Sequence, residues 1–441
     1  MQLKNKFAAP GLGASLAAAA CTLLGNAPAQ AADINEKLAD KDWVVDSALL
    51  YYGEDQGRVK DVSARANVSH PLSEDRKLDV GITVDALTGA SPSGAVKSDS
   101  VQTFTRPSGQ GQYQIAAGAQ PLDDTFKDTR FAGTGSYTTN MGAASRLQLG
   151  LDASAEHDYF HAGINGRWET DFNQKNTTLF AGAAFGSDSI NPVGDVPVAF
   201  SPMRPAGVTP NRSGSKETKT VVDALLGVSQ IINRRSLVDV VLSFSNASGY
   251  LNDPYKVLSI VDPITGRPVA SPTDPSMSWY VYEKRPDKRT REGLFAEYRY
   301  AFDRDSTTLS YRFMNDDWGI RSHTVEAKYH WNFSKHSSLE PQFRYYTQTA
   351  ADFYKTLLIN NQPLPAFASA DYRLAKMSSW TVGAKYTWAS DSGREYSVRG
   401  AYYRQSSDAS SSSSIGVLNS FSELVPAVKA VIVQFGVKFG L

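Results

Sequence analysis

The 441-residue chain is poor in several of the features that usually mark a function. It has one cysteine and six histidines, which excludes disulfide scaffolds, iron–sulfur clusters and zinc clusters. It has no charge excess, because 45 lysines and arginines balance 45 acidic residues, and this excludes a nucleic-acid binder that works by bulk electrostatics. After residue 31, no run approaches the roughly 18 apolar residues of a spanning helix, which excludes a helical membrane protein.

The first residues have the features of an export signal. Two lysines precede an apolar stretch over 14–24, and small residues stand at the cleavage positions in 29–31. The sequence therefore predicts a signal peptide over 1–31 and a single domain over 32–441. Because Cys21 follows three alanines, as in a weak lipoprotein signal, lipidation of this residue stays an alternative.

Apolar and polar residues alternate through most of the remaining chain. In 78–86 and in 147–155, every second residue is apolar, and polar or charged residues fill most of the gaps. Such segments run for about 10–13 residues, which is longer than ordinary globular strands and long enough to cross a membrane when tilted. The segments are 45–53, 59–69, 76–87, 129–140, 145–156, 159–171, 177–187, 219–231, 236–248, 290–302, 306–314, 321–333, 338–348, 376–388, 394–404 and 426–441.

The connections between these segments favour one architecture. Every other connection is a tight polar turn, and the long loops 88–128, 188–218, 249–289, 349–375 and 405–425 all fall on the other side. This arrangement predicts an all-β fold, a transmembrane antiparallel β-barrel of about sixteen strands with short periplasmic turns and long extracellular loops, in the Gram-negative outer membrane. A soluble β-sandwich or β-helix is the alternative, but aromatic residues near strand ends favour the barrel.

The last segment alternates to the final residue, Leu441, and resembles the signal that barrel-assembly machinery recognises. The expected partners are therefore outer-membrane lipid and, during biogenesis, the barrel-assembly machinery, with no nucleic acid.

If the apolar faces meet lipid, the opposite faces line the lumen. That lining mixes both charge signs, which favours a hydrated wall of paired charges or a conduit for small polar solutes over a strongly ion-selective pore. The predicted lumen-lining residues are Arg65, Asp85, Arg167, Glu169, Glu297, Arg299, Arg312, Glu326, Lys328, Arg344 and Arg399, together with Asp79, Asp223 and Asp239.

A catalytic function finds little support in the sequence. His157, His161 and His323 are candidate bases near the outer rim, but no Gly-x-Ser-x-Gly segment accompanies them. We expect no enzymatic activity, no cofactor and no metal site.

Several motifs in the second half of the chain resemble a known family. They are Gly249–Lys256, Glu283–Asp287, Tyr311–Ile320, Arg344–Gln348 and Ala351–Tyr354, with Leu50–Tyr52 near the start. Together they resemble the Gram-negative domain-of-unknown-function family number thirty-five seventy, whose members are regarded as outer-membrane β-barrel-like proteins without an assigned activity. The resemblance also implies a redox-linked envelope system with a periplasmic or lipoprotein partner.

The predicted topology brings these motifs to one extracellular rim. We expect the acids and arginines there to form ion pairs that fix the loops over the mouth of the barrel, or to form a docking site for a solute or partner. The rim candidates are Asp253, Arg285, Arg289, Arg291, Asp316, Asp317, Trp318, Asp352 and Tyr354.

Two functions remain open from the sequence. The first is a channel or porin-like conduit for small polar solutes. The second is a non-transporting barrel scaffold that holds a periplasmic or surface partner. An open lumen favours the first function, and a loop folded into the lumen favours the second.

Overall fold

The structure is a computed structural model that describes residues 43–123, 127–408, 415–421, 424, 425 and 427–441. The predicted signal peptide and Cys21 lie outside the described residues.

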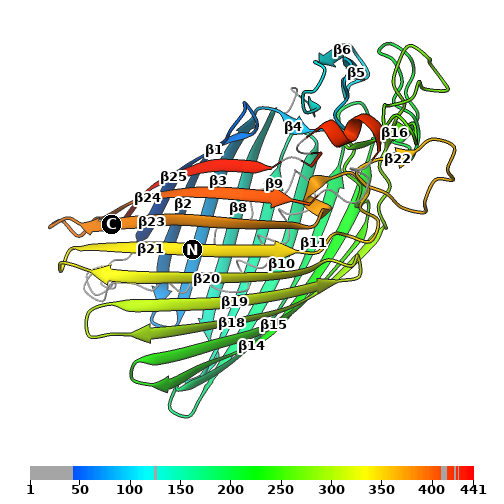
Figure 1. Cartoon of the computed structure of the whole chain (residues 1–441). Helices are drawn as coiled ribbons and strands as arrows, with labels where there is room; N and C mark the ends of the chain where they lie inside the picture. The colour runs from blue at the N-terminus through cyan, green and yellow to red at the C-terminus, as the bar shows by residue number, and fades with distance from the viewer. Residues whose placement is uncertain (1–42, 124–126, 409–414, 422–423, 426) are drawn as a thin grey trace.

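Within the described residues, sixteen strands form one closed antiparallel barrel, as the sequence predicts (Figure 1). The barrel closes because the first strand pairs with both the second and the last. In order around the barrel, the strands are β1 (Val44–Glu54), β2 (Lys60–Ser73), β3 (Arg76–Thr88), β8 (Lys127–Asn140), β9 (Ser145–Ala155), β10 (Tyr159–Phe172), β11 (Thr177–Ile190), β14 (Glu217–Asn233), β15 (Ser236–Gly249), β18 (Lys288–Ala301), β19 (Ser306–Asp316), β20 (Arg321–Asn332), β21 (Ser337–Gln348), β23 (Met377–Ala389), β24 (Glu395–Ser407) and β25 (Val428–Gly440).

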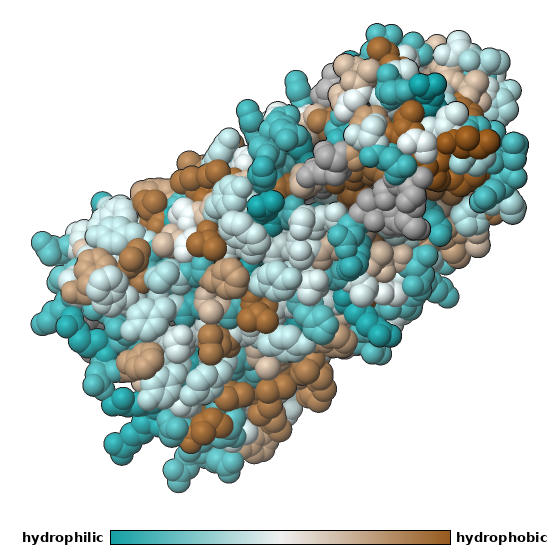
Figure 2. All heavy atoms as spheres, in the orientation of Figure 1, coloured by the Kyte–Doolittle hydropathy of each residue, from teal (hydrophilic) through white to brown (hydrophobic). Residues whose placement is uncertain are grey.

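Short turns join the strands at one end of the barrel, the short-turn end, and the long loops leave from the other, which we call the mouth. Side chains that alternate along each strand separate the two faces of the wall. On β3, for example, Val80, Ile82 and Val84 are exposed on the outside, whereas Gly81 and Asp85 are buried inside. Figure 2 shows apolar side chains spread along the wall and hydrophilic ones gathered toward both ends of the molecule. No helix in the described part of the chain is long and apolar enough to span a membrane.

The inner wall differs from the expectation in one place. The sequence predicts polar residues throughout the lumen, but Phe180, Ala184, Leu225 and Val241 form a buried apolar cluster on the inner faces of β11, β14 and β15. The cluster was missed because β14 and β15 have apolar residues on both faces, as in Val221-Val222 and Val240-Val241, so alternation does not distinguish inside from outside there.

The long loops contain structure that alternation could not predict. Short strands form small sheets in them, and the cap that they build lies beyond the mouth (Figure 1). The loop elements are β4 (Ser91–Pro92), β5 (Gln102–Thr105), β6 (Gln112–Ile115), β7 (Leu122–Asp123), β12 (Val196–Pro197), β13 (Arg212–Gly214), β16 (Val257–Val261), β17 (Tyr280–Tyr282), β22 (Leu358–Ile359), and the 3₁₀ helices η1 (Tyr372–Leu374) and η3 (Gly416–Ser420).

The cap has its own apolar interior. Phe104, Met203 and Tyr280 come from three different loops and lie in one buried cluster. A second cluster joins Val261 with Leu418 of the last loop. Because apolar burial stabilises the loops against each other, the cap is a packed body and not a set of independent loops.

Candidate functional site

The predicted lumen-lining residues all lie on the inner wall, and all are buried or half-buried. Several are paired along one strand at spacing i, i+2: Arg167 with Glu169 at 2.6 Å, and Lys328 with Glu326 at 2.6 Å. Glu297 and Arg299 make the same kind of pair, also at 2.6 Å. Three further members form ion pairs: Asp85 with Arg130, Arg299 with Asp239, and Asp79 with Lys77. Arg344 lies opposite Glu326 in the strand register, Asp223 lies opposite Ser245, and the guanidinium of Arg312 lies over the ring of Phe295. Arg65 lies on β2 and Arg399 on β24.

Exposure of the inner wall changes along the barrel axis. Near the short-turn end, the side chains of Asp79, Arg299 and Arg146 are 31–41% exposed. Near the mouth, the ion-paired carboxylates of Asp85, Asp188 and Asp316 are only 0–3% exposed. The change is not uniform, since Arg130 near the mouth is 21% exposed and Asp171 near the short-turn end is 7% exposed, but the most exposed of these paired charges lie at the short-turn end and the least exposed lie beneath the cap.

The candidate bases do not share one environment. His161 lies between two carboxylates, with Nε2 2.7 Å from Asp152 and Nδ1 2.5 Å from Asp188, so both ring nitrogens are engaged. His323 faces outward, with its Nδ1 2.7 Å from the hydroxyl of Tyr311. His157 lies in the loop between β9 and β10.

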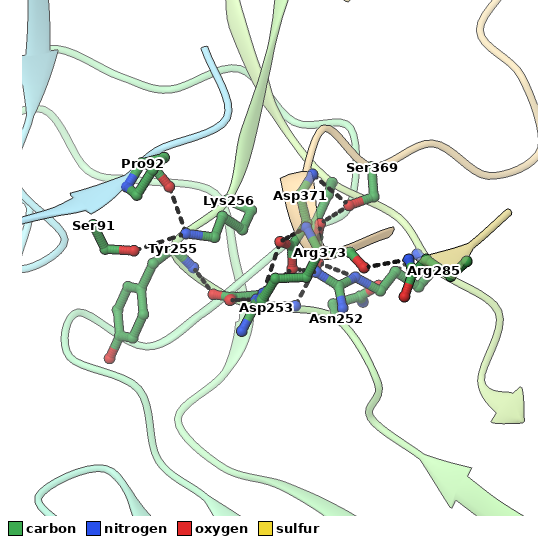
Figure 3. A network of polar contacts seen from close by, with 12 residues as sticks. Ser91, Pro92, Asn252, Asp253, Tyr255, Lys256, Arg285, Ser369, Asp371 and Arg373 are labelled. Atoms are coloured by element: carbon green, nitrogen blue, oxygen red, sulfur yellow. Dashed lines mark hydrogen bonds and ion pairs between the residues drawn. The ribbon is translucent and has the colours of Figure 1, made fainter. Parts of the chain in front are cut away.

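A buried ion-pair network, which we call the clamp, fastens the loops of the cap together (Figure 3). Arg285 contacts Glu283 at 2.6 Å and Asp371 at 2.8 Å. Arg373 contacts Asp371 as well, and it contacts Asp253 at 2.9 Å. These residues join the β15–β18 loop to the β21–β23 loop.

Lys256 extends the clamp to a third loop. Its ammonium group donates to the carbonyl of Pro92 at 2.5 Å and lies 3.3 Å from the hydroxyl of Ser91, as Figure 3 shows. Three connections that lie far apart in the sequence therefore meet at one polar centre inside the cap.

Burial and the neighbouring charges shift the pKa values of the clamp acids. Burial raises the pKa of Glu283 to about 7, against the attraction of Arg285. Although burial also opposes ionisation of Asp371, the guanidinium groups of Arg373 and Arg285 hold its pKa well below the ordinary range. Asp371 is therefore a fixed anion, and Glu283 is the clamp acid that titrates near neutral pH.

The remaining rim candidates occupy several separate places. Asp317 accepts a hydrogen bond from the backbone of Thr290, and Asp352 lies against Gly319, where a Cβ atom would come within 2.3 Å of its carboxylate. Tyr354 is buried in the apolar cluster of the cap that also contains Trp318. Arg289 pairs with Asp316, and Arg291 lies on the inner wall two residues further along β18.

The 3₁₀ helix η1 crosses the mouth. The guanidinium of Arg58, in the β1–β2 connection, lies 5.7 Å from the centre of the Tyr372 ring. Leu374 shares a buried cluster with Val221 and Ala247, which lie on the inner faces of β14 and β15. Because β14 is eighth in order around a sixteen-stranded barrel, η1 connects nearly opposite walls.

Sequence reasoning missed four of the six residues of the clamp. Glu283 is part of a recognised motif but was not chosen as a site residue, and Asp371, Arg373 and Lys256 were not chosen either. The available signal was Asp371-Tyr372-Arg373, a charged triplet in a long loop.

A group of three carboxylates also escaped the sequence analysis. Oxygen atoms of Asp128, Glu156 and Asp158 lie within 4.8 Å of one another at the mouth, and the carboxylate of Asp158 accepts a hydrogen bond from Tyr255 at 2.5 Å. Burial, with the neighbouring charge of Asp128, raises the pKa of Glu156 to about 8. The hydrogen bond between Glu156 and Asp128 also favours the protonated form of Glu156.

Comparisons with known proteins give a family but no activity. The profile of a family described as "Protein of unknown function (DUF3570)" matches residues 13–439. A search of the curated proteins finds no match.

Among solved structures, a bacterial polysaccharide outer membrane secretin is 10% identical and has a TM-score of 0.44, with 90% of this chain and 98% of that chain covered. Pseudomonas aeruginosa OccK2 (OpdF), solved in complex with glucuronate, is 9% identical with a TM-score of 0.39, and the coverage is 92% and 99%. The siderophore receptor PirA from Acinetobacter baumannii is 9% identical with a TM-score of 0.39. This comparison covers 82% of the present chain but only 52% of the receptor, so the chain spans about half of the receptor's length.

Proposed function

Because this chain belongs to the DUF3570 family, which is described only as a protein of unknown function, we propose a function from the barrel itself: an outer-membrane receptacle, closed at the cell surface and open to the periplasm. In this proposal the cap faces outward, since outer-membrane barrels carry their long loops outside the cell. The lumen then holds a periplasmic ligand or a segment of a periplasmic partner, and it binds without catalysis.

The architecture supports placement in the outer membrane. A closed sheet leaves no unpaired strand edge, which satisfies the backbone in lipid. Exposed apolar residues on the outside, such as Ile82, Leu151 and Leu226, suit contact with acyl chains.

The single observation that carries the receptacle proposal is the exposure gradient of the inner wall. Arg146 and Arg299 at the short-turn end are partly open to solvent, whereas the carboxylates of Asp188 and Asp316 beneath the cap are covered. The clamp and the apolar interior of the cap both stabilise the closed mouth, and opening it would expose both.

Two single-cysteine variants test this proposal in a Cys21→Ser background. Ser136 lies on the inner face of β8 toward the short-turn end, and Ser154 lies on the inner face of β9 near the mouth. In detergent micelles, a small hydrophilic maleimide is expected to label the Ser136→Cys variant at least tenfold faster than the Ser154→Cys variant. Replacing 350–375 by a short Gly-Ser turn is expected to bring the two rates together. Equal rates in the capped barrel would overturn the proposal.

A gated conduit for small polar solutes is the second candidate, and the paired charges along the lumen wall favour it. A sixteen-stranded barrel is wide enough for an aqueous channel. Swelling of proteoliposomes in arabinose distinguishes the two functions: the receptacle gives no swelling above protein-free liposomes, and a conduit that opens spontaneously does.

A further inference from the structure

Two opposite charges on the inner wall face the lumen without forming an ion pair. Arg291 of β18 and Asp223 of β14 lie in one row of the sheet, because Asp223 pairs in register with Ser245 and Ser245 pairs in register with Arg291. Neighbouring strands lie about 4.8 Å apart, so the two backbones are separated by roughly 10 Å. The two side chains interact electrostatically with each other, and Arg291 also with Asp316 and Asp317, but neither makes an ion pair with a described residue.

Each of the two residues has hydrogen-bonding atoms without a partner among the described residues. Arg291 leaves Nε and Nη2 without a hydrogen-bond partner, and both atoms are buried. These two donors form one edge of the guanidinium fork, the edge that binds a carboxylate in bidentate fashion. Asp223 leaves Oδ1 buried and without a partner, and a carboxylate oxygen accepts from an ammonium group.

An unpaired charge is costly, and on the described inner wall Arg399 shares this property with Arg291 and Asp223. The neighbouring Arg289 has its own partner in Asp316, and Arg299, further along β18, contacts Glu297 and Asp239. Asp223 is buried and Arg291 is half-buried, and a charge removed from water without a partner costs free energy, so a fold that retains both in one row of the sheet has a reason for the arrangement.

The surroundings add an apolar wall. Ala184 pairs in register with Asp223, Leu225 follows two residues along β14, and both belong to the inner apolar cluster with Phe180 and Val241. Asp223 also lines a small cavity together with Asp152, His161 and Gly163.

We infer that Arg291 and Asp223 form a binding site for a small zwitterion with an apolar side group, of the α-amino acid class. The carboxylate of the ligand takes the Nε–Nη2 edge of Arg291, its ammonium group takes Asp223, and its side group lies toward Ala184 and Leu225. The inference rests on the proposed function, because such a ligand would enter through the open short-turn end. It identifies the class of ligand that the receptacle holds.

Titration calorimetry on the purified barrel in detergent micelles measures the binding of three probes. L-Leucine carries both charges, 4-methylpentanoate lacks the ammonium group, and 3-methylbutylamine lacks the carboxylate. L-Leucine is expected to bind, and each truncated probe is expected to bind at least tenfold more weakly. Equal binding of the three, or no binding of L-leucine, overturns the inference.

Variants identify the residues that bind. Arg291→Met is expected to weaken L-leucine binding at least tenfold, whereas Arg299→Met, a matched change on the inner face of the same strand, leaves it unchanged. Asp223→Asn is expected to remove the preference for L-leucine over 4-methylpentanoate. Binding that survives in both Arg291→Met and Asp223→Asn overturns the assignment.

Folding is checked by heat-modifiable gel migration. Removing an unpaired, half-buried charge should not lower the unfolding temperature, so Arg291→Met is expected to fold at least as well as the parent. If Arg291→Met alone fails to fold, Arg291→Lys replaces it, because lysine keeps the charge but not the bidentate edge. Arg291→Lys is expected to weaken L-leucine binding at least tenfold, and undiminished binding overturns the assignment. If proteoliposomes swell while L-leucine binds as expected, the receptacle fails and the site stands.

Discussion

The guanidinium carbon of Arg289 lies 4.4 Å from the centre of the Trp318 ring. The same guanidinium donates through Nε to Asp316 at 2.8 Å, and Asp316 accepts the backbone N–H groups of Trp318 and Ile320. The end of β18 and the β19–β20 loop are therefore held by a stacked cation, a carboxylate and a buried indole. Trp318 is also packed edge-on against Phe353 of the β21–β23 loop, at 5.0 Å between ring centres. This connects the rim to the segment that crosses the mouth.

Trp318→Ala is expected to lower the free energy of unfolding by about 3–5 kcal/mol, because it removes a buried aromatic side chain and leaves a cavity. Hydrogen exchange should increase in 317–320 and in 349–376, and urea unfolding in micelles gives the energy. Arg289→Lys, which keeps the charge but not the Nε donor, should have a smaller effect. Unchanged exchange in 349–376 would contradict the connection between the rim and the crossing segment.

Arg285→Met tests the clamp. Removing Arg285 takes away the ion-pair partner of Glu283 and one of the two cationic partners of Asp371, and it is expected to cost about 3–5 kcal/mol. The matched control is Arg267→Met in the same loop, because Arg267 pairs with Asp99 at the surface, where a pair contributes about 0–1 kcal/mol. Limited proteolysis of the β15–β18 and β21–β23 loops gives the readout. Equal protease resistance of the two variants would refute a stabilising clamp.

Two glycines of the wall differ in the space around them. A Cβ atom on Gly227 would lie 2.3 Å from the Phe180 ring, which is confined because Arg167 lies 4.2 Å above its centre. Gly227→Ala is therefore expected to destabilise the barrel by about 1–3 kcal/mol through overpacking. Gly133→Ala, where nothing lies within 4 Å of the added atom, should change stability little. The heat-modifiability midpoints of the two variants provide the comparison, and similar midpoints would argue against a packed inner cluster.

Glu156→Gln tests the carboxylate group at the mouth. Burial and Asp128 raise the pKa of Glu156 from 4.5 in its ordinary state to about 8 in the fold, so the folded protein holds a proton that the unfolded chain releases. The contribution of this group to stability is therefore lost as pH rises from 4.5 toward about 8. Relative to the parent, the Gln variant should gain stability between about pH 5 and about pH 9, measured by urea unfolding. A pH-independent difference would show that Glu156 is ionised throughout.

The sequence predicted the barrel because a strand that separates lipid from water must alternate. This constraint is local, so the pattern in 78–86 and 147–155 located β3 and β9 without knowledge of their neighbours. The predicted strand ends differ from the structure, since β2 and β14 extend beyond their predicted limits into turns where no lipid enforces alternation.

The cap could not be predicted in the same way. Its sheets depend on distant pairings, such as Ile260 with Leu358, which leave no periodic signal in short strands. The rim motifs correctly drew attention to Arg285 and Asp253, but their partners Asp371 and Arg373 lie in a loop whose fold is set by the clamp itself.

Single-channel recording in planar lipid bilayers tests most directly whether the mouth of the barrel is closed. The parent barrel and the variant in which 350–375 is replaced by a short Gly-Ser turn are recorded under the same salt and voltage. The parent is expected to insert without conductance steps, and the variant, which lacks the segment that crosses the mouth, is expected to give the steps of an aqueous pore. Steps of equal size in the two proteins would contradict it.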